Sequence, residues 1–206
     1  ESLRSLSKER LLQLSKVHRK LLLAALCYFL AMLSKEPAVL LPILFLFFDA
    51  FIAKVPWRGF LHPSVIGRYI LLGIPLLLYG AMRMAVLGGF GNGSGYYGTF
   101  SLAERVYAFV TLFGQYLGKL FVPYPLIFYY PFSKSADFTS LAFLLSSIAL
   151  IAFVAFFVWT VKTRRHLVGL FLLWFFVFLS PVFIALDSVG ENVFSERYLF
   201  GPSVGF

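Results

Sequence analysis

Long apolar runs separated by short polar stretches are the main feature of this chain. A helix that crosses a lipid bilayer needs about 20 apolar residues, because each residue adds ~1.5 Å of length and the hydrocarbon layer is ~30 Å thick. The pattern therefore predicts an all-α fold, a polytopic transmembrane helical bundle of about five spans. The predicted spans cover residues 19–34, 38–53, 69–87, 140–161 and 167–186.

A polar stretch, Ser34-Lys35-Glu36-Pro37, separates the first two apolar runs. One continuous helix through both runs would place two charged side chains at mid-membrane, at a cost of roughly 2.5–3.5 kcal/mol each. In a hairpin, both charges reach a membrane face. Pro37 then lies in the first turn of the second helix, where its missing N–H costs little. We therefore expect a hairpin whose tip is residues 34–37.

Residues 101–122 show a different, amphipathic pattern. Ser101 and Glu104 have the spacing of a capping box, which predicts the start of a helix. The polar stripe of this helix consists of Glu104, Ala108, Thr111, Gln115 and Lys119, and apolar residues cover the rest. We expect this helix to lie along the outer membrane interface or to dip into the membrane and return. The alternative is a sixth span.

Composition supports lipid as the main solvent. Hydrophobic residues make up 60% of the chain and charged residues 13%, which excludes an ordinary water-soluble domain. The single cysteine, Cys27, excludes a disulfide within the chain and argues against a thiolate metal site. Histidines 18, 62 and 166 lie far apart without metal-ligand spacing, so no metal site is expected.

Basic residues fix the expected orientation. Twelve of the eighteen lysines and arginines lie in residues 1–20, 54–68 and 162–165, and the positive-inside rule places those segments in the cytoplasm. The net charge of +9 is thus explained by topology and anionic headgroups rather than by nucleic acid. The hairpin tip, Arg83 and the two long loops then face outward.

This topology describes one membrane domain. It comprises a cytoplasmic basic segment (1–18), three spans within residues 19–87, and an outer loop (88–139) that holds the amphipathic helix. Two further spans within residues 140–186 and an outer loop (187–206) complete it. Because the chain begins with Glu1 and stops directly after a polar motif, we expect it to be part of a longer protein.

Several outward polar residues suggest a binding site for an anion. Lys35, Arg83 and Arg197 each lie next to a predicted membrane face on the same side, and such cations suit a phosphate or pyrophosphate group. Each also has a plainer interpretation: a snorkelling Arg83, an interfacial Lys35–Glu36 pair, and a solvated Arg197. The aromatic stretch PYPLIFYYPF, residues 123–132, is typical of an interfacial belt and could also flank a sugar or lipid.

Four motifs carry a family resemblance: LSKEPAVLLPILFLFFD, LYGAMRMAVLGG, QYLGKLFVPYPL and SERYLFGPSVGF. In this order they resemble the membrane half of the transmembrane-and-TPR-containing glycosyltransferases. That family belongs to the GT-C class, which uses polyprenyl-phosphate sugars and includes the protein O-mannosyltransferases. The last motif is the most specific, because it is close to the family's E-R-x-L-Y-x-P-S-x-G-F.

The resemblance implies an integral-membrane transferase with its active site on the non-cytoplasmic side. It would move a sugar from dolichyl or undecaprenyl phosphate to a hydroxyl acceptor, expected on a protein. Arg197 would hold the donor phosphate, with Lys35 and Arg83 as further phosphate or sugar contacts. Glu36 and Glu196 would orient those cations, and Tyr198 and Lys119 would support them. A TPR domain is expected downstream.

One departure from the family pattern concerns catalysis. In the GT-C class, the catalytic carboxylate lies in the first outer loop, and nothing in this chain corresponds to it. Asp137, Asp187 and Glu191 are outward carboxylates that match no motif. The catalytic base is therefore unknown, and this part alone is expected to be inactive.

Two other functions remain open. One is a transporter or lipid flippase, in which the same charges would line a path; such proteins usually show inverted repeats, and none is visible here. The other is a non-catalytic membrane scaffold. We expect the protein to lie in a bacterial plasma membrane rather than in the membrane of the endoplasmic reticulum.

Overall fold

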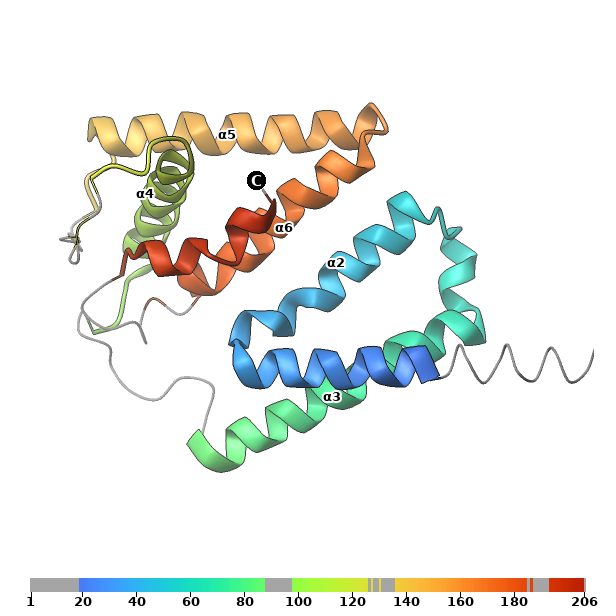
Figure 1. Cartoon of the computed structure of the whole chain (residues 1–206). Helices are drawn as coiled ribbons and strands as arrows, with labels where there is room; N and C mark the ends of the chain where they lie inside the picture. The colour runs from blue at the N-terminus through green and yellow to red at the C-terminus, as the bar shows by residue number, and fades with distance from the viewer. Residues whose placement is uncertain are drawn as a thin grey trace, which may run out of the picture. The chain divides into compact units, whose positions relative to one another are not determined.

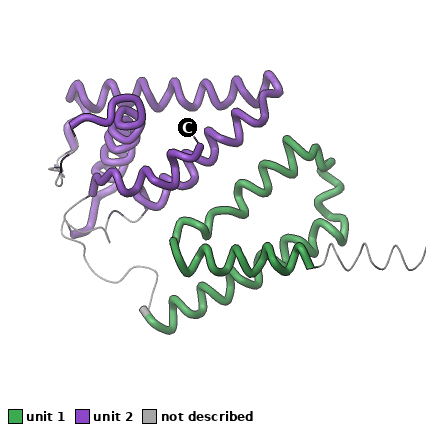
Figure 2. Tube along the Cα trace, viewed as in Figure 1, with its two compact units in different colours: residues 1–90 green, residues 91–206 purple. Residues whose placement is uncertain are grey.

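The computed structural model describes residues 19–87, 98–125, 127, 130, 136–184, 186 and 193–205, and within these ranges every regular element is helical. The all-α prediction is therefore confirmed for this part. The chain divides into two compact units, residues 1–90 and 91–206 (Figure 2). The predicted cytoplasmic segment 1–18, Asp187 and Glu191, and parts of both outer loops lie outside the described residues.

Unit 1 begins with a helix over residues 19–34, after which the chain turns at Lys35. The next segment is broken into a 3-10 turn (η1, Glu36–Leu40), a short α-helix (α2, Leu41–Phe47) and a π turn (η2, Phe48–Ile52). Pro37 and Pro42 lie in the first turns of η1 and α2, where a missing N–H is tolerated. A further 3-10 turn (η3, Trp57–Leu61) leads into the long helix α3, Pro63–Leu87 (Figure 1).

Within the described residues, three helices are long and apolar enough to cross a membrane: Pro63–Val86, Leu141–Lys162 and His166–Ile184. They correspond to the last three predicted spans, and they indicate a membrane protein. The prediction of five spans is not confirmed. Residues 19–34 form a helix only ~24 Å long in the described part. Residues 38–53 are divided among η1, α2 and η2. Pro42 lacks the N–H that would continue the hydrogen bonding of η1 into α2.

Polar contacts hold unit 1 together at both ends of α3. The buried carboxylate of Asp49, in η2, accepts hydrogen bonds from Arg68 (3.1 Å) and from the hydroxyl of Tyr69 (2.9 Å). Near the other end of α3, Arg83 donates to Glu36 of η1. Between these ends, a small apolar cluster packs the first helix against η1 and α3. Its buried members are Tyr28, Met32 and Ala38.

Unit 2 contains three helices: α4 (Leu102–Phe121), α5 (Leu141–Lys162) and α6 (His166–Ile184). Two 3-10 turns, η5 (Glu196–Leu199) and η6 (Pro202–Gly205), follow them. One apolar core joins these elements. Its fully buried members include Ala108, Leu112, Phe113 and Tyr116 of α4, Leu179 of α6, and Val193.

Helix α4 is packed on several sides rather than exposed along a polar stripe. Ser101 and Glu104 form the predicted capping box at its start. Ala108 and Thr111, which the sequence placed on the polar stripe, are buried, and the Thr111 hydroxyl donates to the carbonyl of Tyr107 (2.8 Å). In Figure 1, α4 is seen almost along its axis where α5 runs across the picture. The depth of α4 in a membrane stays a prediction.

Candidate functional site

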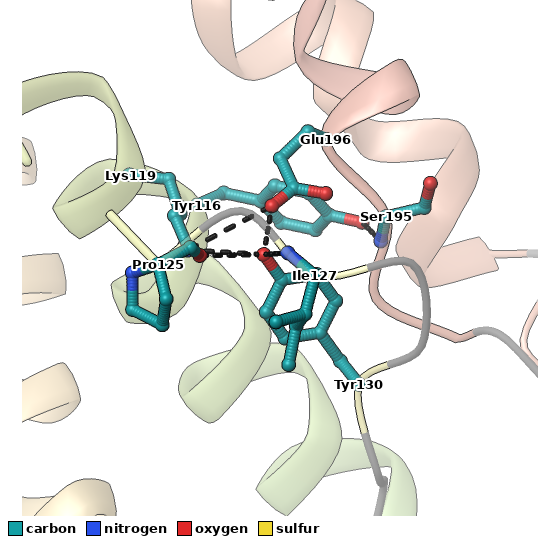
Figure 3. A network of polar contacts seen from close by, with 7 residues as sticks. All are labelled: Tyr116, Lys119, Pro125, Ile127, Tyr130, Ser195 and Glu196. Carbon is teal, nitrogen blue, oxygen red and sulfur yellow. Dashed lines mark hydrogen bonds and ion pairs between the residues drawn. The ribbon is translucent and has the colours of Figure 1, made fainter. Parts of the chain in front are cut away.

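The last turn of α4 carries a lysine that is almost completely enclosed. The Lys119 side chain is only 13% exposed. Its ammonium group donates to the hydroxyl of Tyr130 (3.1 Å) and to the carbonyl of Pro125, and it lies 4.9 Å from the centre of the Tyr130 ring. A carboxylate oxygen of Glu196 is 3.7 Å away (Figure 3). A partly buried cation is thus compensated by one carboxylate, one carbonyl and one aromatic face.

The hydroxyl of Tyr130 lies at the centre of this network. It accepts hydrogen bonds from Lys119 and from the backbone N–H of Ile127 (3.2 Å). Two acceptors surround it, the carbonyl of Pro125 (2.9 Å) and the carboxylate of Glu196. Because the hydroxyl has one proton, it donates to only one of them at a time. A charged carboxylate is the stronger acceptor, so Tyr130 links the ammonium of Lys119 and the carboxylate of Glu196 (Figure 3).

Tyr116, in the core, fixes the segment that carries Glu196. Its hydroxyl accepts a hydrogen bond from the backbone N–H of Ser195 (3.2 Å), and its ring lies 4.5 Å from that of Phe194. Burial raises the pKa of Tyr116 well above its usual range, so the phenol stays protonated at neutral pH. Glu196 therefore starts η5 from an anchored position, which holds its carboxylate close to Lys119.

An open cleft of about 490 Å³ borders the network. Tyr124 is strongly exposed at this cleft, while Lys119 and Tyr130 contribute polar atoms to it. The cleft thus combines aromatic surface with a cation. Its lining residues are Gln115, Gly118, Lys119, Val122, Tyr124, Pro125, Tyr130 and Phe194.

Unit 1 holds a second cluster with the same three kinds of side chain. Arg83, 20% exposed, donates to the carboxylate of Glu36 and to the hydroxyl of Tyr79 (3.3 Å). Glu36 is 67% exposed. A carboxylate from a 3-10 turn and a tyrosine thus hold a less exposed cation from a neighbouring helix, as Glu196 and Tyr130 do for Lys119.

In both clusters, the residue beside the carboxylate is an exposed cation. Lys35 precedes Glu36, and its ammonium has no polar partner among the residues that the structure describes. Arg197 follows Glu196; it donates to the hydroxyl of Tyr198 (2.9 Å), with its guanidinium 4.9 Å from the centre of that ring. The carboxylates hold the less exposed cations, and the exposed faces of Lys35 and Arg197 remain accessible.

The predicted site residues therefore fall into two groups. Glu36 contacts a cation, Arg83; that it orients Arg83 for a ligand, as the resemblance implies, stays a prediction. Glu196 contacts Lys119 rather than Arg197, and Tyr198 is the residue that holds Arg197. Lys35 and Arg83 belong to unit 1, and Arg197 and Lys119 to unit 2. That the predicted phosphate contacts share one hollow stays a prediction.

Sequence reasoning missed the structural roles of three tyrosines. Tyr79 lies one helical turn before Arg83, a spacing that predicts contact on one helix face. Tyr130 was placed in an aromatic belt or beside a ligand. It contacts Glu196, 66 residues away, and no local signal predicts that contact. Tyr116 looked like any other apolar position of α4.

The described carboxylates outside the two clusters have structural roles. Asp137 accepts hydrogen bonds from the backbone N–H (3.0 Å) and the hydroxyl (2.7 Å) of Thr139, which hold the pKa of Asp137 below its usual value. It organises the turn before α5 and has no contact that suggests catalysis. Within the described ranges, no group of three or more His, Cys, Asp or Glu residues could hold a metal ion.

The chain was also compared with known proteins. No protein-family model, curated protein or solved structure matches it.

Proposed function

We propose that this chain forms part of an integral-membrane glycosyltransferase of the GT-C type. It moves a sugar from a polyprenyl-phosphate donor to a hydroxyl acceptor, on a protein, at the non-cytoplasmic face. Two independent features support the proposal. One is the order of four motifs along the sequence, and the other is the way in which the cations of those motifs are held.

The observation that carries the proposal is how the neighbouring charges are paired. In Lys35-Glu36 and in Glu196-Arg197, the carboxylate contacts a second cation, while the motif's own cation stays exposed. If each carboxylate paired with its neighbour in the sequence, Lys35 and Arg197 would not be available for a ligand. Here the carboxylates neutralise Arg83 and Lys119, so Lys35 and Arg197 keep their positive charge for an anionic group such as a phosphate.

These cations would act on the leaving group. As the bond between the sugar carbon and the phosphate oxygen breaks, its electron pair stays with the phosphate, and the acceptor oxygen bonds to the sugar carbon. A guanidinium fork at Arg197 would stabilise the charge that develops on the phosphate. The acceptor proton would pass to a general base. Glu36 and Glu196 are occupied by their cations, so we assign that base to neither.

The test is transfer activity of the full-length protein carrying Arg197→Ala. We expect transfer from the polyprenyl-phosphate sugar to be lost while expression and thermal stability are kept. The side chain is exposed, and its polar contact among the described residues is with the neighbouring tyrosine. Removing one placed charge that stabilises a transition state typically costs about 10²–10³-fold in rate. Wild-type turnover of this variant would remove Arg197 from the mechanism.

Arg58→Ala is a matched control. Arg58 is also an exposed arginine in a 3-10 turn, but it belongs to the segment predicted to be cytoplasmic. It should retain full activity. Vesicles that contain the full-length protein also distinguish the transporter hypothesis: movement of a labelled polyprenyl phosphate across the bilayer without sugar transfer would support that function instead.

A further inference from the structure

The turn between α5 and α6 concentrates positive charge at a membrane face. It contains Lys162, Arg164 and Arg165 within four residues, and all three are exposed. The two helices that it joins are both apolar enough to cross a membrane. Because spanning helices place their ends at the level of the lipid headgroups, a turn this short must lie at that level too.

The backbone of this turn has an unusual residue at its critical position. The N–H of Arg165 donates to the carbonyl of Thr160 (2.8 Å), and the N–H of Arg164 donates to that of Val161 (3.2 Å). These bonds form a Schellman motif, in which the residue after the helix adopts a left-handed conformation. Arg164 has φ +58°. Glycine or asparagine is usual there, because a Cβ atom crowds the following carbonyl oxygen and the short amide of asparagine can hydrogen-bond locally. The turn would form at least as well with glycine or asparagine, so the turn does not explain why residue 164 is an arginine.

A tryptophan accompanies the cations. The guanidinium of Arg165 lies 4.8 Å from the centre of the Trp159 ring, and the hydroxyl of Thr163 donates to the carbonyl of Trp159 (2.8 Å). Tryptophan prefers the boundary between hydrocarbon and headgroups. The contact thus holds one guanidinium at the depth where lipid phosphates lie.

No described carboxylate of unit 2 compensates these charges. Asp137 precedes α5, and the 22 residues of that helix separate it from the turn by ~33 Å. Glu104 lies near the same end as Asp137, because Tyr107, one turn further along α4, contacts Phe138 and Phe143. Glu196 is engaged by Lys119 and Tyr130. The three cations therefore need a negative group from outside this part of the chain.

We infer that the α5–α6 turn binds the phosphate of an anionic phospholipid in the adjacent leaflet. The flanking apolar helices and Trp159 favour a lipid over a soluble phosphate, because they hold the cations at headgroup depth. A basic residue near an anionic membrane surface contributes enough attraction for about a fivefold preference over a zwitterionic lipid. This inference is independent of glycosyl transfer and applies equally to a transporter or a scaffold.

The experiment uses the full-length protein in vesicles and the fluorescence of Trp159, which lies in the proposed site. Subtracting the signal of a Trp159→Phe variant isolates the fluorescence of this tryptophan from that of all others. Brominated phosphatidylglycerol and brominated phosphatidylcholine, at equal mole fractions, report which lipid occupies the site. We expect stronger quenching by phosphatidylglycerol.

Arg164→Asn is the decisive variant, because asparagine suits the left-handed position and the turn should keep its fold. We expect its preference for phosphatidylglycerol to fall about fivefold. Arg105→Gln is the matched control: it removes one charge near the opposite end of α5 and should keep the wild-type preference. Equal quenching by both lipids in the wild type, or an unchanged preference in Arg164→Asn, would overturn the inference.

Soluble phosphate separates the two sources of the anion. Inorganic phosphate, added at constant ionic strength, should leave the lipid preference unchanged if the site is built for a headgroup in the membrane. Loss of the preference would show that the turn recognises phosphate free in solution, and the assignment to a lipid would be wrong.

Discussion

The ammonium of Lys119 lies 3.7 Å from the carboxylate of Glu196, and the hydroxyl of Tyr130 contacts both groups. Helix α4 and turn η5 are thereby connected across 77 residues of sequence by one polar contact. The contact fixes Glu196, and through the backbone it also fixes the start of the ERYL segment that presents Arg197. Its disruption should therefore affect both stability and the proposed site.

Tyr130→Phe tests this connection, because it removes the hydroxyl and keeps the ring that packs edge-on against Phe194 at 4.8 Å. Hydrogen bonds to charged groups contribute about 1.5–3 kcal/mol, so we expect a loss of stability of about that size. Thermal unfolding in detergent measures it. Tyr124→Phe is the control, since that side chain is largely exposed. Equal stability of the two variants would show that the hydroxyl contributes nothing.

Glu36 and Lys35 are neighbours in the sequence, but substitutions at the two positions should affect stability and transfer differently. Glu36→Gln removes the charge that holds Arg83, but Glu36 is largely exposed, so we expect a loss of stability below about 1 kcal/mol. Transfer should fall in this variant because Arg83 is no longer held in place. Lys35→Gln should lower transfer without changing stability, since its side chain has no described polar partner. Unfolding and turnover, measured on both variants, check this difference.

If Lys35→Gln unfolds as readily as a core variant, Lys35 has a structural contact and is not available for a ligand. Lys54→Gln provides the comparison. It removes an exposed lysine from the segment predicted to be cytoplasmic, and it should change neither transfer nor stability.

Two glycines of α4 provide a matched pair for the packing of unit 2. A Cβ at Gly114 would lie 2.2 Å from the hydroxyl oxygen of Ser146 and 2.8 Å from its Cα. The backbone of α5 would have to move, so Gly114→Ala should destabilise the protein by about 1–3 kcal/mol. A Cβ at Gly118 meets no atom within 4 Å. Gly118→Ala should be stabilising by up to about 1 kcal/mol, because alanine favours a helix.

Thermal unfolding of both variants in the same detergent checks this prediction. Close approach of helices through small residues is typical of membrane proteins, and Gly114 with Ser146 would be an example between α4 and α5. If both alanine variants unfold at the same temperature, the two helices do not cross at this point.

Local signals in the sequence predicted much of the fold. The capping box of Ser101 and Glu104 gave the start of α4, and uninterrupted apolar runs gave α5 and α6 within two residues at each end. Such features depend on neighbouring residues only. The first two spans were predicted from hydropathy, which does not report how the backbone of an apolar run is hydrogen-bonded. The structure divides that run into short helical pieces.

The candidate site was less predictable, for a physical reason. Lys119, Tyr130 and Glu196 come from three separate segments, and their contact depends on how the core of unit 2 packs. The resemblance implied that Glu36 orients a cation, and in the structure Glu36 contacts Arg83. It assigned Glu196 to neighbouring cations, although adjacent residues in a turn direct their side chains differently, and Arg197 contacts Tyr198 instead.

The turn before α5 predicts how the stability of the protein depends on pH. Thr139 donates two hydrogen bonds to the ionised carboxylate of Asp137, so the folded-state pKa lies below the usual value. Above the unfolded-state pKa, about 3.9, the ionised group stabilises the fold. This contribution is lost as the pH falls through the folded-state pKa, because the unfolded chain then binds the proton more readily. At neutral pH it is fully present.

Asp137→Asn should remove this dependence on pH. Asparagine can still accept the hydrogen bonds of Thr139 but carries no charge, so the difference in stability between wild type and variant should shrink between about pH 5 and pH 3. Unfolding by denaturant across that range, in one detergent, measures the difference. Thr139→Val should reproduce part of the effect from the donor side, since it removes the hydroxyl and keeps the bond from the backbone N–H. If the difference stays constant down to pH 3, the carboxylate does not stabilise the start of α5 through its charge.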